Sequence, residues 1–148
     1  FALTSFSQVN TRSGTDFSFA WKNCRKLPRF PLLDVSNGTN FDGAWNECYE
    51  LTDFPLLDFS SGTNFSDAWN SCKLDQQSVI NVLTALNKVP FAQLTSTATR
   101  IGTSLGPVSG RNTKTIEAAL RGIQAIDTLL NSLGTDGVAG KGWTITFD

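Results

Sequence analysis

Histidine and methionine are both absent from this chain of 148 residues, and charged residues make up only 17% of it. Without histidine, the chain lacks the most common general base and the most common protein ligand for metal ions. Ser–His and Cys–His catalysis and a histidine-bearing zinc site are therefore excluded within the chain. Because it starts at Phe1 and not at methionine, we expect it to be processed or to be part of a longer polypeptide.

An excess of positive charge and long apolar runs are missing as well. The 12 Lys and Arg residues are balanced by 13 Asp and Glu residues, so the net charge is −1, whereas nucleic-acid-binding domains normally carry a basic patch. No apolar run reaches the roughly 18 residues of a membrane-spanning helix, and no signal-peptide pattern opens the chain. We therefore expect neither nucleic acid nor membrane as a partner.

Three copies of a 24-residue unit make up the first half of the chain, at residues 1–24, 25–48 and 49–72. A period of this length is typical of repeat proteins, in which each unit buries its apolar side against the next. Repeated apolar residues are therefore expected to contact their own copies. The positions that are identical in all copies are, in the second copy, Leu27, Phe30, Gly38, Thr39, Phe41, Ala44, Trp45 and Cys48.

Two hydrophobic patterns alternate within each unit. Leu27, Phe30 and Leu32 have the L-x-x-L-x-L spacing of a leucine-rich-repeat strand, which places Leu32 inside and Arg29 outside. The second pattern runs from Phe41 to Cys48 with the spacing i, i+3, i+4, i+7, which predicts one face of a short helix. The expected N-caps of these helices are Asp16, Asn40 and Asn64.

The second half of the chain has lost the 24-residue period and alternates between helix and strand patterns. We expect a first helix over Ser78–Lys88, which is capped between Asp75 and Ser78 and ended by Pro90, and then a strand near Arg100–Ile101. A second helix is expected over Lys114–Leu133, followed by the C′ glycine Gly134. The last expected strand runs through Trp143, Ile145 and Phe147. The predicted fold is therefore an α/β solenoid of leucine-rich-repeat type with three 24-residue coils over residues 1–74. An α/β capping region over residues 75–148 closes it.

The run from Ala44 to Asp58 resembles the BspA-like class of leucine-rich repeats, whose pattern is Ala-aromatic-x-x-Cys-x-x-Leu-x-x-hydrophobic. The form with Trp and Gly-Thr-Asn-Phe is similar to arrays in tail-fibre and other surface proteins of marine phages and in bacterial surface proteins. Residues 141–146 also resemble the close of such arrays. The resemblance implies adhesion, receptor binding or virion structure, and it implies neither catalytic residues nor a cofactor.

Two repeated columns allow more than one interpretation. Cys24, Cys48 and Cys72 could bind metal or form one disulfide, but their spacing lacks the paired clustering of a zinc site, which favours a column of buried thiols. The tryptophans at positions 21, 45 and 69 could stack on sugars. Their apolar neighbours favour a place in the core instead, and we predict no metal site.

The acidic column of Asp34 and Asp58, with Asn10 at the equivalent position, could bind Ca²⁺ or cap the turn that follows the strand. Turn capping is the favoured interpretation. A carboxylate pair for glycoside hydrolysis would need a cleft and a raised pKa on one partner, and the sequence indicates neither.

Side chains on the outward face of the predicted strands are the candidate binding residues: Thr4, Ser5, Arg29, Thr52 and Asp53. They differ between copies more than the core columns do, although Arg29 and Asp53 could simply pair with each other across strands. An open first copy would expose Phe6 and Phe17, so we expect a further coil, a domain or a partner chain to cover residues 1–24.

These features predict a non-catalytic recognition or structural module at the surface of a phage virion or tail fibre. Its partner would be a host receptor or glycan, or a neighbouring virion protein, and the chain would belong to a larger polypeptide or multimer. A fragment of a bacterial cell-surface adhesin is the alternative, and a carbohydrate-active enzyme is the rival from another class. The predicted location is extracellular in the first two cases.

Overall fold

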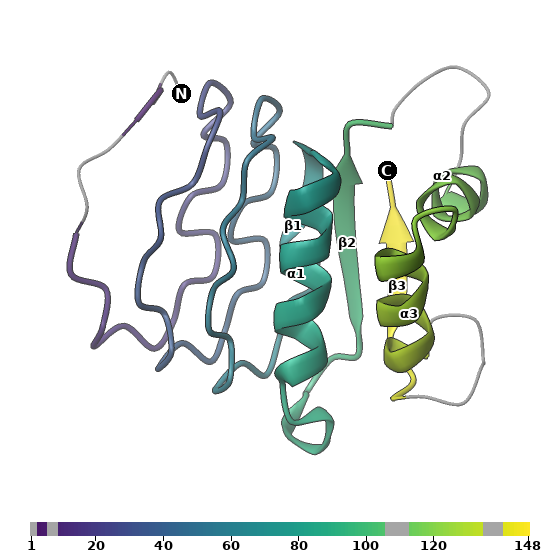
Figure 1. The fold of residues 1–148 in the computed structure, drawn as a ribbon. Helices are drawn as coiled ribbons and strands as arrows, with labels where there is room; N and C mark the ends of the chain where they lie inside the picture. Colours follow the sequence, from purple (N-terminus) through teal and green to yellow (C-terminus); the bar gives the residue numbers. More distant parts are fainter. Residues whose placement is uncertain (1–2, 6–8, 106–112, 135–140) are drawn as a thin grey trace.

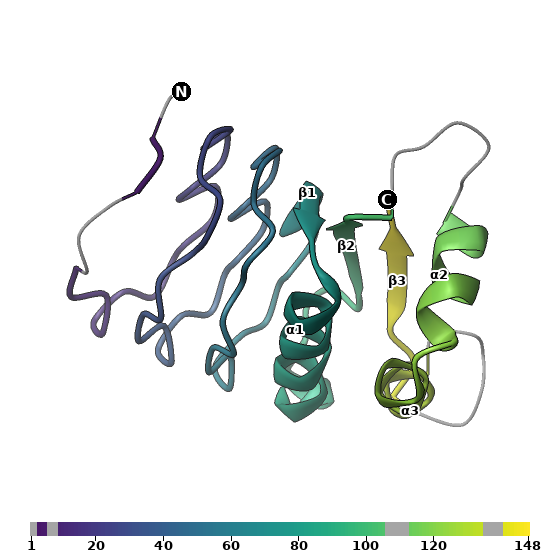
Figure 2. The ribbon, with the colours of Figure 1, turned by 45° about the horizontal axis from the view of Figure 1, so that its top comes forward.

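The computed structural model describes residues 3–5, 9–105, 113–134 and 141–148, which contain one open sheet of three parallel strands in the order β1-β2-β3 (Figure 1). The strands are β1 (Trp69–Leu74), β2 (Ala98–Thr103) and β3 (Thr144–Phe147); the helices are α1 (Gln76–Lys88), α2 (Thr113–Arg121) and α3 (Gln124–Leu133), with a short 3₁₀ helix, η1, at Phe91–Gln93. Helices α1 and α3 lie side by side on one face of the sheet (Figures 1 and 2).

The predicted leucine-rich-repeat-type solenoid of three 24-residue coils is wrong, because the structure is a small α/β arrangement whose sheet begins only at Trp69. The described residues before Trp69 contain turns and isolated bridges but no helix or strand. The expected strand around residues 27–32 is reduced to one parallel bridge between Arg29 and Asp53. The expected helix over residues 41–48 consists of turns.

Left-handed residues explain why the helical spacing of Phe41 to Cys48 does not produce a helix. Gly43 and Glu47 have φ of +60° and +63°, which an α-helix does not allow. The N–H groups of Phe41 and Trp45 donate to the carbonyls of residues 64 and 68 in the third copy, both at 2.8 Å, and not to carbonyls one turn back. Alternating left-handed residues thus reproduce the spacing of a helix face without its hydrogen bonds.

Strand β1 occupies the positions of the third copy that were predicted to be helical. It pairs in parallel with β2, with Trp69 opposite Ile101, and β2 pairs in parallel with β3, with Ala98 opposite Thr144. Gly102 permits the close approach of β1 and β2, because a Cβ at this position would lie 2.3 Å from the backbone oxygen of Cys72. The segments that were predicted as helices therefore lie in a row, and the last of them forms the first strand of the sheet.

The predictions for the second half are largely confirmed. The carboxylate of Asp75 accepts the N–H of Ser78 at 2.8 Å and caps α1, and Gly134 ends α3 in the left-handed conformation with φ +74°. Strands β2 and β3 lie where they were expected. The single predicted helix over residues 114–133 is two helices, α2 and α3, which are separated by Gly122 and Ile123.

One continuous cluster of buried side chains joins the repeats to the sheet and the helices. It includes Leu33 and Leu57, whereas Leu32 and Leu56 are 63% and 46% exposed, so the inward position predicted for Leu32 is wrong. An irregular chain does not maintain the strict two-residue alternation of a strand, and the second leucine of each pair turns inward instead. The boundary predicted after residue 74 stays a prediction.

Candidate recognition surface

Three of the predicted binding residues, Arg29, Thr52 and Asp53, lie together on adjacent copies of the repeat, and all are exposed. The backbone N–H and the hydroxyl of Thr52 both donate to the carbonyl of Pro28, at 3.0 and 3.2 Å. Phe30 donates its N–H to the carbonyl of Asp53 at 3.0 Å. These bonds hold Arg29 beside Asp53 through the backbone.

Thr4 and Ser5 are also exposed, but no hydrogen bond among the described residues joins them to Pro28 or Arg29. The predicted ion pair between Arg29 and Asp53 is likewise absent from the ion pairs of the described residues. Pairing between the copies occurs nearby, where Lys26 lies 2.8 Å from Glu50. The charges of Arg29 and Asp53 therefore remain available at the surface.

The exposed leucines extend this surface toward helix α1. Leu56 borders a groove of about 380 Å³ between its own segment and α1. The groove is lined by Leu56, Leu57, Asp58, Phe59, Ser60, Ala85 and Lys88. We call Arg29, Leu32, Thr52, Asp53, Leu56 and this groove the recognition surface. Sequence reasoning missed its apolar part, since a Leu-Leu pair does not reveal which leucine turns inward.

Helix α1 forms a fixed wall of the recognition surface. The hydroxyl of Ser78 accepts the N–H of Phe54 at 2.8 Å, and the side-chain amide of Asn81 donates to the carbonyl of Phe54 at 2.9 Å. Because both bonds join α1 to the backbone of Phe54 in the third copy, they fix the position of the helix beside the irregular segment that forms the other wall of the groove.

The acidic column caps turns, as predicted. Asp34 accepts both the N–H and the hydroxyl of Ser36, at 3.1 and 2.6 Å, and these hydrogen bonds lower the pKa of its carboxyl group. Asp58 and Asn10 accept N–H groups two residues ahead in the same way. Among the described residues, no group of three or more His, Cys, Asp or Glu side chains could hold a metal ion.

The tryptophan column belongs to the core, which confirms the favoured interpretation for Trp45 and Trp69. Their indole rings are stacked with centroids 5.5 Å apart, and both side chains are buried. Trp21 stacks on Trp45 at 5.4 Å but is only partly buried, because it stands at the end of the column. Buried rings cannot serve as a platform for sugars.

All three cysteines are buried free thiols, which confirms the predicted thiol column. The Sγ of Cys48 donates to the carbonyl of Trp21 at 3.1 Å, and that of Cys72 donates to the carbonyl of Trp45 at 3.3 Å. Burial raises the pKa of the Cys48 thiol to about 12. These thiols therefore remain protonated at neutral pH and are structural.

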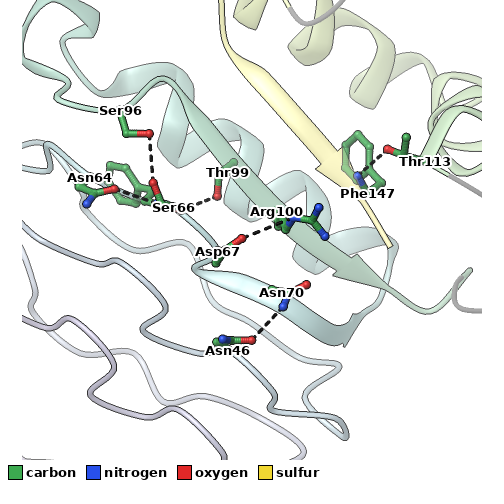
Figure 3. Close-up of polar contacts among 11 residues, drawn as sticks. Asn46, Asn64, Ser66, Asp67, Asn70, Ser96, Thr99, Arg100, Thr113 and Phe147 are labelled. Atoms are coloured by element: carbon green, nitrogen blue, oxygen red, sulfur yellow. Dashed lines mark hydrogen bonds and ion pairs between the residues drawn. The ribbon is translucent and has the colours of Figure 1, made fainter.

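The sheet side of the molecule carries polar groups that are paired with each other (Figure 3). Asp67 in the third copy lies 3.5 Å from Arg100 on β2, and the side chain of Asn70 donates to that of Asn46 at 3.0 Å. These contacts join the repeats to each other and to the sheet.

No family model matches the chain, and neither a curated protein nor a solved structure matches it. In the part of the chain that the structure describes, no helix combines the length and the apolar character needed to cross a bilayer.

Proposed function

We propose that the protein is a non-catalytic recognition module of a phage virion or tail fibre and contacts a host receptor through the recognition surface. The observation that carries this proposal is the pair of leucines, Leu32 and Leu56, that are exposed at the same position of neighbouring copies, each three residues along the chain from the paired Arg29 and Asp53. Adjacent exposed apolar side chains with a polar rim are typical of surfaces that bind other molecules. The resemblance of residues 44–58 to BspA-like repeats supports the same function.

Three aspartates of the repeats support a non-catalytic role. Asp16, Asp34 and Asp58 each accept hydrogen bonds from the serine two residues ahead. Such bonds stabilise the charged form of a carboxylate, whereas a general acid needs a raised pKa. These three carboxylates therefore serve the turns, and we propose that the chain acts by binding.

The size of the recognition surface indicates weak binding by a single copy. It offers two leucines, one groove and two charges, which is little for a stable complex of a monomer. Display of many copies on one particle raises the apparent affinity by about 10²–10⁴ without new contacts. We therefore expect the isolated chain to bind weakly and a multimer to bind well.

The experiment compares the monomer with the chain fused to a trimerisation domain, on a panel of whole bacterial cells, with bound protein measured by flow cytometry. The trimer is expected to bind at least one strain much more strongly than the monomer. Leu32→Ser with Leu56→Ser, and the charge swap Arg29→Asp with Asp53→Arg, are each expected to reduce that binding. Neither set of changes removes a buried side chain.

The matched control is the swap Asp67→Arg with Arg100→Asp, which also preserves net charge but lies on the sheet side. It is expected to leave binding unchanged. If the control swap or changes in residues 91–97 abolish binding while both recognition-surface variants bind normally, the receptor contacts another part of the protein and the proposal is wrong.

A further inference from the structure

The first copy of the repeat ends in a backbone edge made of carbonyl groups, and we propose that this edge binds one more unit of the same 24-residue kind. We call the carbonyls of Asp16, Ser18, Ala20 and Lys22 the acceptor edge. None of these four carbonyls accepts a hydrogen bond from the residues that the structure describes. The inference rests on the backbone contacts of the repeats and is independent of the proposed function.

Hydrogen bonds between the copies run in one direction along this row. Phe17, Phe19, Trp21 and Asn23 donate their N–H groups to the carbonyls of the second copy at 2.8–2.9 Å; the acceptors are Asn40, Asp42, Ala44 and Asn46. The second copy donates to the third in the same way and over the same distances. The acceptor edge is the first member of this series, with the same carbonyls in the same positions but without a donor among residues 3–5, 9–105, 113–134 and 141–148.

The edge cannot pair with a second copy of itself. Along residues 17–24, the N–H groups that do not reach the second copy are used locally: Ser18 donates to the side chain of Asp16, and Ala20, Lys22 and Cys24 donate to carbonyls three residues back. Two such edges would therefore bring carbonyl against carbonyl, which leaves the acceptors without partners. The occupant must supply the donors.

The start of the edge sets the direction of the occupant. In the second and third copies, Thr39 and Thr63 donate their N–H groups to the carbonyls of Thr15 and Thr39, each at 2.7 Å. At this position the later copy donates to the earlier one, whereas along the rest of the row the earlier copy donates to the later one. The N–H of Thr15 is the equivalent donor of the first copy. A donor at one end followed by a row of acceptors fits a parallel segment whose groups are arranged as in the repeats.

The aromatic side chains define the chemistry of the occupant. Phe17 is only 8% exposed, so the predicted exposure of this ring is wrong, whereas Phe6 lies outside the described residues. Trp21 is the ring left partly open, and it stacks on Trp45 with nearly parallel planes, 8° apart. An occupant with an aromatic residue and a Trp four positions later would continue both stacks.

The left-handed positions add a further requirement. The residues two positions after the aromatic residue and after the Trp have positive φ in each copy, as at Gly43 and Glu47. Glycine and asparagine adopt this conformation most readily. The sequence that fits the edge is therefore aromatic-x-Gly-x-Trp-x-Asn or a close variant, which is the pattern of the repeat itself.

The opposite end of the row is closed, so head-to-tail stacking of this chain does not supply the occupant. On β3, the N–H of Phe147 donates to the hydroxyl of Thr113 at 2.8 Å, and α2 packs beside this strand (Figure 2). Each copy donates N–H groups to carbonyls of the copy that follows it along the chain. A unit directly upstream of the first copy would reach the acceptor edge in the same way, and we assign the occupant to that position.

The test adds a copy of residues 25–48 directly before Phe1 and measures hydrogen exchange of the full fusion by NMR. The added unit's amides at the positions of Phe41, Gly43, Trp45 and Glu47 are expected to exchange at least about tenfold more slowly than in the free 24-residue peptide. A second version of the fusion has Phe in place of the Trp of the added unit, so that the added unit contributes no Trp fluorescence. In this version, acrylamide is expected to quench Trp21 less than it does in the original chain.

The matched control carries the same added unit with Ser at the positions of Phe41 and Trp45. It keeps the length and the donors but lacks the rings, and we expect it to show neither protection nor reduced quenching. Unprotected amides in the aromatic fusion would overturn the proposal. Equal protection in the control fusion would overturn the assignment of an aromatic occupant.

Discussion

The phenyl ring of Phe19 lies against Gly43, which occupies the equivalent position in the next copy of the repeat. A Cβ built on Gly43 would stand 2.5 Å from Cε1 of this ring. Both residues are left-handed, with φ of +56° and +60°. The contact therefore joins two left-handed residues of adjacent copies, and it favours glycine in the second copy for two separable reasons.

Gly43→Ala is expected to destabilise the protein, because the new Cβ is strained at positive φ and clashes with Phe19. The backbone strain alone costs on the order of 1–3 kcal/mol. In a Phe19→Ala background the clash disappears, so the cost of Gly43→Ala should be smaller there. Urea unfolding of the wild type, both single variants and the double variant measures the difference. Equal costs in the two backgrounds would show that the ring does not restrict residue 43.

Trp45→Ala is expected to cost about 3–5 kcal/mol of unfolding free energy, the usual range for a large aromatic side chain removed from a core. Trp45 is buried and stacks on a tryptophan in each neighbouring copy. Trp21→Ala should cost less, because Trp21 has such a neighbour on one side only. Chemical denaturation of both variants checks the order, and a Trp21 variant as damaging as the Trp45 variant would contradict the open end of the column.

Gly102→Ala is expected to destabilise the sheet by about 1–3 kcal/mol or more, because the added methyl group meets the backbone of Cys72, which cannot rotate away. Gly122→Ala is the matched control. A Cβ there meets only the carbonyl of Ala119, at 3.2 Å, so we expect a change within about 0.5 kcal/mol. Thermal melts of both variants decide this, and a Gly102 variant that melts like the wild type would rule out the close approach of β1 and β2.

Alkaline pH is expected to destabilise the protein through Cys48. Its thiol pKa is raised from 9.0 to about 12, mainly because burial disfavours the thiolate. The folded state therefore holds a proton that the unfolded state releases above pH 9. This contribution is complete below pH 9 and is lost as the pH rises toward 12. Unfolding free energies from pH 7 to 11 should fall less steeply for Cys48→Ala than for the wild type. Parallel slopes would contradict the prediction.

Much of the molecule follows from local features of the sequence. The 24-residue period alone indicates that Trp45, Phe41 and Cys48 pack against their own copies, because a unit this short cannot bury its apolar side without a neighbouring copy. Asp75 and Gly134 mark the ends of helices through hydrogen bonds within a few residues of each cap. Asp34 and Asp58 likewise cap turns two residues away, so these predictions needed no knowledge of distant parts of the chain.

The candidate site was only partly predictable. Arg29, Thr52 and Asp53 were identified from their variable positions in the repeat, and the structure brings them together. Leu32 and Leu56 were predicted wrongly, because each is followed by a second leucine and the pattern allows either to turn inward. The groove beside Leu56 depends on the docking of α1 through Ser78 and Asn81, which no local pattern indicates.

The amino-acid sequence by itself determined which residues repeat, that the cysteine column and the central tryptophans are buried, and where α1 is capped and α3 ends. Only the tertiary structure decided the secondary structure of the repeats. The spacing of Phe41 to Cys48 suits both an α-helix and a chain with left-handed residues at Gly43 and Glu47. The choice depends on which carbonyls accept hydrogen bonds from these N–H groups. In this protein they are carbonyls of the next copy of the repeat, which are distant in the sequence and come close only in the folded chain.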